Sequence, residues 1–140
     1  MPTRGPETTS PLLVSILRQG DVLLASINAA LDDGEMLRFQ EALVERIGQE
    51  RSRGVIIDVA ALDVIDSYGA RTLGVLAEMA RLRGAETILV GVSPEIAFTM
   101  VRLGMTIAHV HTALDLEQGL QVLAQLTQRG GAPQQRTGPR

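Results

Sequence analysis

The stretch DVIDSYGAR, which runs from Asp63 to Arg71, places a serine beside acidic side chains where strand-like residues give way to a helix-like pattern. Three interpretations of Ser67 fit this position: a helix cap, a catalytic nucleophile and a phosphorylation site. The first is the simplest, because short polar side chains at a helix N-terminus accept hydrogen bonds from the first amides and contribute about 1 kcal/mol. Either Asp66 or Ser67 suits this role.

A serine nucleophile is the second interpretation, since one large class of hydrolases presents its serine on a strand-to-helix turn. That turn requires glycine two residues before and two residues after the serine. Gly69 fits the second position, but Ile65 occupies the first. The candidate bases, His109 and His111, lie on another predicted strand, so the sequence disfavours a hydrolase.

A phosphorylation switch is the third interpretation. A serine at a helix N-terminus faces the positive end of the helix dipole, and phosphorylation adds about −1.5 to −2 charges. On Ser67 this charge would be favoured by the helix amides and opposed by Asp63 and Asp66. We therefore expect phosphorylation to change the stability of the fold little and the surface potential greatly, as an on/off binding surface requires.

Asp58 interrupts an apolar strand, and a buried carboxylate needs a donor or a partner. We expect it near the open end of this strand, oriented toward the same helix N-terminus as Asp66. Convergent carboxylates would suit Mg²⁺. However, no glycine-rich phosphate loop accompanies them, and they serve equally well as caps, so we predict no metal site.

Arg71 and the two histidines are the remaining polar candidates. Arg71 follows Ser67 by one helical turn and could hold Asp66 or a phosphate; the alternative is an ordinary solvated charge. His109 and His111 share one face of a predicted strand. Two histidines do not make a zinc site in a chain without cysteine, so a structural or surface pair is expected.

The composition limits the possible functions. The 140-residue chain fits one domain, with 45% apolar residues and a net charge of −3. Aromatic residues make up only 2% and no dense basic tract occurs, which disfavours a nucleic-acid partner. The lack of cysteine and lysine excludes disulfides, thiolate zinc sites and nucleophiles of either type. Without a signal peptide or an apolar run of roughly 20 residues, a cytoplasmic protein is expected.

The apolar patterns predict one domain, 12–127, with elements in the order ββαβαβαβα. The predicted segments are a hairpin around Gly20 (12–28), helices at 32–50, 68–84, 93–103 and 113–128, and strands at 54–60, 85–92 and 106–112. Right-handed crossovers then give a mainly parallel sheet with helices packed against it. The ends, 1–11 and 128–140, are rich in proline, glycine and polar residues and are predicted to be disordered.

The sequence also indicates where two helices begin and which helix faces are buried. Asp32 and Glu35 have the spacing of a capping box, and Ser93 followed by Pro94 is a strong helix start. The first helix should bury Met36, Phe39, Leu43 and Ile47, with Leu37 and Val44 widening the stripe. The last helix should place Leu116, Leu120, Leu123 and Leu126 on one face.

The segment GVIIDVAALDVIDSYGAR (54–71) and the block VGVSPEIA (90–97) resemble the STAS domain family. The resemblance extends over roughly 12–126. It implies the α/β STAS fold: a mainly parallel, mixed central sheet of about five strands with four helices packed against it. It also implies that Ser67 is phosphorylated. The implied surroundings of this site, which also bind the partner, are Asp58, Asp63, Asp66, Tyr68, Gly69 and Arg71.

Within the family the sequence is most similar to the RsbS subgroup. This similarity is carried by the pattern D-S-aromatic-x-x-R from Asp66 to Arg71 and by the segment LDDGEMLRFQEAL (31–43). Gly69 departs from the subgroup toward the general antagonist pattern. A stand-alone, SpoIIAA-like antagonist that binds a single anti-sigma kinase therefore stays open as the alternative.

The RsbS resemblance implies a regulator of bacterial stress signalling that is not an enzyme and needs no cofactor. Such proteins assemble with RsbR-type STAS paralogues into the stressosome, which sequesters an RsbT-type switch kinase. Phosphorylation of the serine, here Ser67, releases the kinase, and an RsbX-type phosphatase resets the state. No nucleic acid or membrane is implied as a partner.

Overall fold

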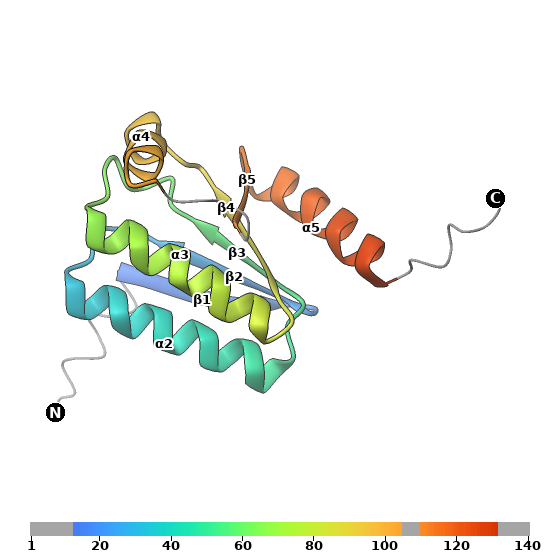
Figure 1. The fold of residues 1–140 in the computed structure, drawn as a ribbon. Coiled ribbons are helices and arrows are strands. Elements are labelled where there is room, and N and C mark those ends of the chain that lie inside the picture. Colours follow the sequence, from blue (N-terminus) through green and yellow to red (C-terminus); the bar gives the residue numbers. More distant parts are fainter. Residues whose placement is uncertain (1–12, 105–109, 132–140) are drawn as a thin grey trace, which may run out of the picture.

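The computed structural model describes residues 13–104 and 110–131 of the chain (Figure 1). Its elements are β1 (Val14–Gln19), β2 (Val22–Ile27), α2 (Asp33–Glu50), β3 (Gly54–Asp58), α3 (Ser67–Leu82), β4 (Glu86–Val90), α4 (Pro94–Arg102), β5 (Val110–Ala113) and α5 (Leu116–Gly131). The predicted alternation of strands and helices is confirmed. Residues 1–12, 105–109 and 132–140 lie outside the described residues, and with them His109 and the start of the predicted fifth strand.

The strands form one five-stranded sheet in the sequential order β1-β2-β3-β4-β5. The first pair is the predicted antiparallel hairpin, in which Gln19 faces Val22 and Gly20 takes the positive φ of +63° that suits glycine. The strands β2 to β5 are parallel to one another. The predicted mixed, mainly parallel sheet is therefore confirmed.

Helices cover both faces of the sheet. α2 and α3 lie side by side on one face (Figure 1), where they and α4 enclose the larger core, and α5 packs against β3, β4 and β5 on the other. Side chains of β3 alternate between the faces: Val55 and Ile57 join the larger core, and Ile56 joins the core under α5. The continuous apolar run of β3 is thus explained by burial on both sides.

α2 begins at the predicted capping box. The Asp32 carboxylate accepts a hydrogen bond from the Glu35 amide at 2.7 Å, and the Glu35 carboxylate accepts one from the Asp32 amide at 2.8 Å. The predicted apolar stripe is buried, as is Val44. Leu37 was expected to widen the stripe, but its side chain is 41% exposed because its position lies at the outer margin of the helix face.

α5 begins and ends later than predicted. It starts at Leu116 and continues to Gly131, through the residues 128–131 that were expected to belong to a tail. Leu120, Leu123 and Leu126 face the sheet. Leu116 is 41% exposed, contrary to the prediction, because the apolar contacts between α5 and the sheet begin one turn further along the helix.

Candidate phosphorylation site

Ser67 is the first residue of α3, at the end of the sheet where β3 leads into the helix. The N-cap is Asp66, whose extended backbone (φ −84°, ψ 175°) precedes the helix and whose carboxylate accepts from the Gly69 amide at 2.7 Å. The two residues were equally suitable from sequence, and the structure assigns the cap to Asp66 alone. Within the described residues the exposed Ser67 hydroxyl has no hydrogen-bond partner, so it is open to modification.

Gly69 is required by the packing of this turn. Its amide donates to Asp66, and a Cβ at this position would lie 2.9 Å from Cγ1 of Ile65 and 3.2 Å from the capping carboxylate. Both distances are shorter than ordinary van der Waals contact. The residue that blurred the choice of subgroup from sequence therefore has a structural explanation, namely the half-buried Ile65 beneath the helix start.

Asp58 is the last residue of β3, at the open end of the strand as expected. Its side chain serves the backbone of the following loop, because its carboxylate accepts from the Ala60 amide at 2.9 Å. By strand alternation Asp58 shares the face of Ile56 and of its neighbour Val90, which is the face under α5. The expected orientation toward the α3 N-terminus is therefore wrong, since α3 covers the opposite face.

Asp63, Asp66 and Tyr68 surround Ser67, as their sequence positions require, and all are exposed. Arg71 is also exposed and lies one turn after Ser67 on the same helix face. Among the described residues no ion pair joins Arg71 to Asp66, so the guanidinium remains available to a group on Ser67.

Apolar side chains are exposed at the same end of the molecule. On the β3–α3 segment Val64 is 64% exposed and Tyr68 is 39% exposed. On the neighbouring helix α4, Phe98 is 62% and Val101 75% exposed. The sequence analysis missed this α4 pair, although both residues lie off the stripe of Ile96 and Met100 that α4 buries.

Ser93 is a further residue whose role at this site the sequence did not reveal. It was predicted as the N-cap of α4, and this is confirmed by the hydrogen bond from the Ile96 amide to its hydroxyl at 3.1 Å. The same hydroxyl donates to the carbonyl oxygen of Asp63 at 2.9 Å. α4 is thereby attached to the loop that precedes Ser67.

The histidine alternative fails on geometry for His111; His109 lies outside the described residues. His111 is half-buried on β5, and its Nε2 lies 3.4 Å from a carboxylate oxygen of Glu86. Glu86 is the first residue of β4. It therefore lies at the opposite end of the parallel strands from the C-terminal end of β3, which leads to Ser67. His111 is therefore not placed to act as a base for this serine.

Neither a metal centre nor a membrane span is found in the described part of the chain. No group of three or more histidine, aspartate or glutamate side chains in 13–104 and 110–131 is arranged to hold a metal ion. Within the same ranges, no helix combines the length and the apolar character that crossing a bilayer demands.

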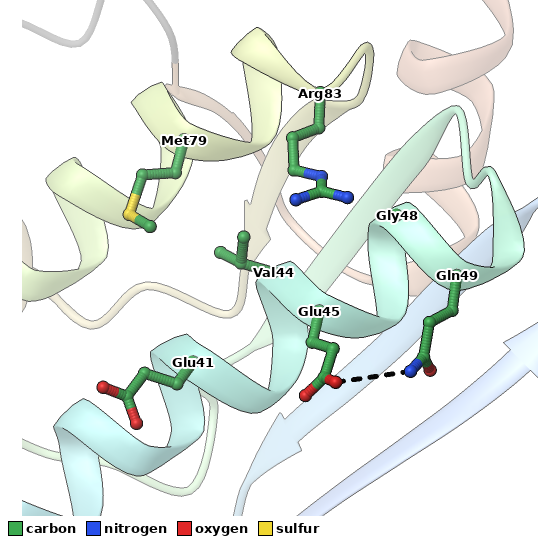
Figure 2. Close-up of a pocket in the computed structure, with 7 residues that line it drawn as sticks. All are labelled: Glu41, Val44, Glu45, Gly48, Gln49, Met79 and Arg83. Atoms are coloured by element: carbon green, nitrogen blue, oxygen red, sulfur yellow. Dashed lines mark hydrogen bonds between the residues drawn. The ribbon is translucent and has the colours of Figure 1, made fainter.

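A surface hollow lies between the C-terminal halves of α2 and α3 (Figure 2). Its lining residues are Glu41, Val44, Glu45, Gly48, Gln49, Met79 and Arg83. Figure 2 shows the Arg83 side chain extending from the end of α3 toward Gly48, where a Cβ would overlap the guanidinium. Ser67 is at the opposite end of α3, so this hollow is separate from the candidate site.

Comparison with known proteins identifies the family and agrees with the fold. Residues 14–128 match the model of the STAS domain, and the chain belongs to this family. A solved serine-to-glutamate variant of RsbS from Moorella thermoacetica is 32% identical with a TM-score of 0.74, covering 82% of this chain and 97% of that one. The predicted similarity to RsbS is thereby confirmed.

Two other proteins extend the comparison. A solved structure of the stressosome, a signal integration and transduction hub, contains a chain that is 30% identical with a TM-score of 0.66, covering 81% of this chain and 98% of that one. The RsbT co-antagonist protein RsbRA of Bacillus subtilis is 31% identical over 109 residues, or 78% of this chain. The match spans only 40% of RsbRA.

Proposed function

We propose that the protein is a non-enzymatic regulator of a bacterial stress-response pathway. In this proposal it is a stressosome component that sequesters an RsbT-type switch kinase and releases it when Ser67 is phosphorylated. One observation carries the proposal: α3 begins with an exposed serine, directly after a separate capping residue, in a chain similar to RsbS, and the serine hydroxyl has no hydrogen-bond partner in the part of the chain that the structure describes. RsbR-type STAS paralogues are the assembly partners, and an RsbX-type phosphatase resets the switch.

The charges at this position support a switch rather than a change of fold. A phosphate on the first helical residue is favoured by the free amides and the dipole of α3. It is opposed by Asp63 and Asp66, both exposed on the same turn and loop. The modification would therefore alter the potential of a surface that also exposes Val64 and Tyr68, while the helix keeps the cap that Asp66 provides.

Phosphate mapping tests the modification. The protein is incubated with an RsbT-type kinase and ATP, and phosphorylated residues are identified by mass spectrometry. We expect phosphate on Ser67 and its loss in Ser67→Ala. Thr112→Ala, which removes an exposed hydroxyl on β5, is the matched control and should be labelled like the wild type. An active kinase that leaves Ser67 unmodified would contradict the proposal.

Kinase binding tests the switch itself. Ser67→Asp should weaken kinase binding at least tenfold, because the added charge adjoins Asp66 and the exposed Val64 and Tyr68. Ser67→Ala should bind like the unmodified protein and fail to release the kinase in the presence of ATP. The affinities are compared by isothermal titration calorimetry. Equal affinity of wild type, Ser67→Ala and Ser67→Asp would refute release by charge.

Assembly distinguishes the stressosome from the SpoIIAA-like alternative. The protein is mixed with an RsbR-type paralogue and a kinase, and the products are sized by analytical ultracentrifugation. A large particle that contains both STAS proteins is expected for a stressosome component. A small complex of this protein with the kinase alone would support the stand-alone antagonist.

A further inference from the structure

The hydroxyl of Ser93 bonds to two segments of the chain at once. It accepts from the Ile96 amide at 3.1 Å, which caps α4, and donates to the Asp63 carbonyl at 2.9 Å, which lies in the loop before Ser67. A hydroxyl offers both a donor and acceptor sites, so one side chain is able to make both bonds. Ser93 therefore joins the start of α4 to the β3–α3 loop.

The beginning of this loop is held by the backbone of the β4–α4 connection. The Val59 amide donates to the Val90 carbonyl at 3.0 Å. Gly91 has φ +75°, and a Cβ there would lie 2.7 Å from the Cβ of Ala60. This close packing fixes the first residues of the loop against the segment that leads to Ser93.

The later part of the loop depends on Ser93. Within the described residues, 61–65 receive no side-chain hydrogen bond other than the one from Ser93 to Asp63. Val64 is exposed, so burial contributes little to holding that residue. Leu62 and Ile65, on either side of Asp63 and Val64, pack into or against the larger core. The Ser93–Asp63 bond therefore holds the exposed part of the loop between these two apolar anchors.

We propose that Ser93 is a positioning residue for Ser67: by tying Asp63 to the N-terminus of α4, it fixes the conformation in which Ser67 meets the kinase. This inference rests on the proposed phosphorylation of Ser67. It adds that α4, a separate element, governs how the serine is presented.

Substitutions at position 93 separate this role from helix capping. Ser93→Ala removes both hydrogen bonds. Ser93→Asp keeps a good cap for α4 but has no proton to donate to Asp63. Ser93→Thr keeps both bonds. Thr99→Asp, at a half-exposed position of α4, introduces the same charge nearby without changing the Ser93–Asp63 hydrogen bond. It serves as the charge control.

Hydrogen–deuterium exchange on the free protein measures, without a kinase, how far the Ser93–Asp63 hydrogen bond stabilises the loop. Amides of 59–66 should exchange about three- to tenfold faster in Ser93→Ala and in Ser93→Asp, as the loss of one hydrogen bond implies. Ser93→Thr and Thr99→Asp should exchange like the wild type. Wild-type exchange in Ser93→Asp would show that Ser93 only caps α4 and would overturn the inference.

Single-turnover phosphorylation by an RsbT-type kinase then measures the consequence for Ser67. The rate of phosphate transfer should fall about three- to tenfold in the Ala and Asp variants and be restored by Ser93→Thr. Faster loop exchange with an unchanged transfer rate would overturn the positioning role alone. A wild-type protein that accepts no phosphate would contradict the proposed function. The exchange data would still show whether the Ser93–Asp63 hydrogen bond stabilises the loop.

Discussion

The Asp66 carboxylate, and not the Ser67 hydroxyl, caps α3, and this assignment separates the helix cap from the proposed phosphorylation site at the next residue. A serine that capped the helix would lose its hydrogen bond on phosphorylation. Because Asp66 provides the cap, Ser67 is able to change charge while the helix start keeps its geometry. Asp66 therefore stabilises the start of α3, whereas the Ser67 side chain is exposed and does not cap the helix.

Substitution of the cap should have a measurable cost. Asp66→Ala should lower the free energy of unfolding by about 1 kcal/mol, because the Gly69 amide loses its acceptor. Asp66→Asn, which keeps a capping oxygen, should lose much less. Ser67→Ala should change stability by under about 0.5 kcal/mol, as expected for an exposed side chain. Urea titrations measure all three, and a larger loss for Ser67→Ala than for Asp66→Ala would reverse the assignment.

At this scale the sequence predicted the exposed neighbours of Ser67, namely Asp63, Asp66 and Tyr68, but not the individual hydrogen bonds. Asp66 and Ser67 are both good caps, and the backbone path of the loop decides between them. The bond from Ser93 to Asp63 joins residues 30 apart, so it exists only once two loops meet. The orientation of Asp58 was mispredicted because it follows from the strand register, which places this residue on the face under α5.

At the scale of the elements, Gly54 allows α5 to pack closely on the sheet. A Cβ at the start of β3 would overlap the side chain of Leu123 from α5. The small residue at this strand position thus allows the helix to approach the sheet closely. Leu123 itself is 3% exposed, so it has little room to move aside.

Gly54→Ala should therefore lower the free energy of unfolding by about 1–3 kcal/mol through overpacking. The double variant Gly54→Ala with Leu123→Ala should lose less than the sum of the two single variants, because the smaller residue 123 relieves the overlap. Urea-unfolding midpoints of the four proteins complete the double-mutant cycle. Strict additivity would show that the two residues do not compete for the same space.

The order of the elements, the capping box of α2 and the Ser93–Pro94 helix start were all predictable, because they depend on local patterns. The exposure of Leu37 and Leu116 was not. Helical periodicity identifies the side of a helix that is apolar. How much of this apolar side is buried depends on where the neighbouring elements begin and end. This is a property of the assembled fold.

At the scale of the whole molecule, phosphorylation should leave the stability nearly unchanged. The favourable interaction of a phosphate with the α3 N-terminus and its repulsion from Asp63 and Asp66 are each of the order of 1 kcal/mol at an exposed site. The free energy of unfolding of the phosphorylated protein should therefore lie within about 1 kcal/mol of that of the unmodified protein. Urea titration of both forms measures this difference. A phosphorylated form that is several kcal/mol less stable would indicate a switch that works by unfolding.

The placement of the α3 cap at Asp66 also has an evolutionary consequence. Among the described residues the Ser67 side chain makes no hydrogen bond, so under the proposed function a single substitution there would give a protein of the same fold that the kinase no longer modifies. Under the same proposal, responsive and silent copies that arise by gene duplication would differ at one exposed side chain and would be able to enter one assembly. The proportion of the two copies would then determine how many phosphorylatable serines the proposed assembly contains.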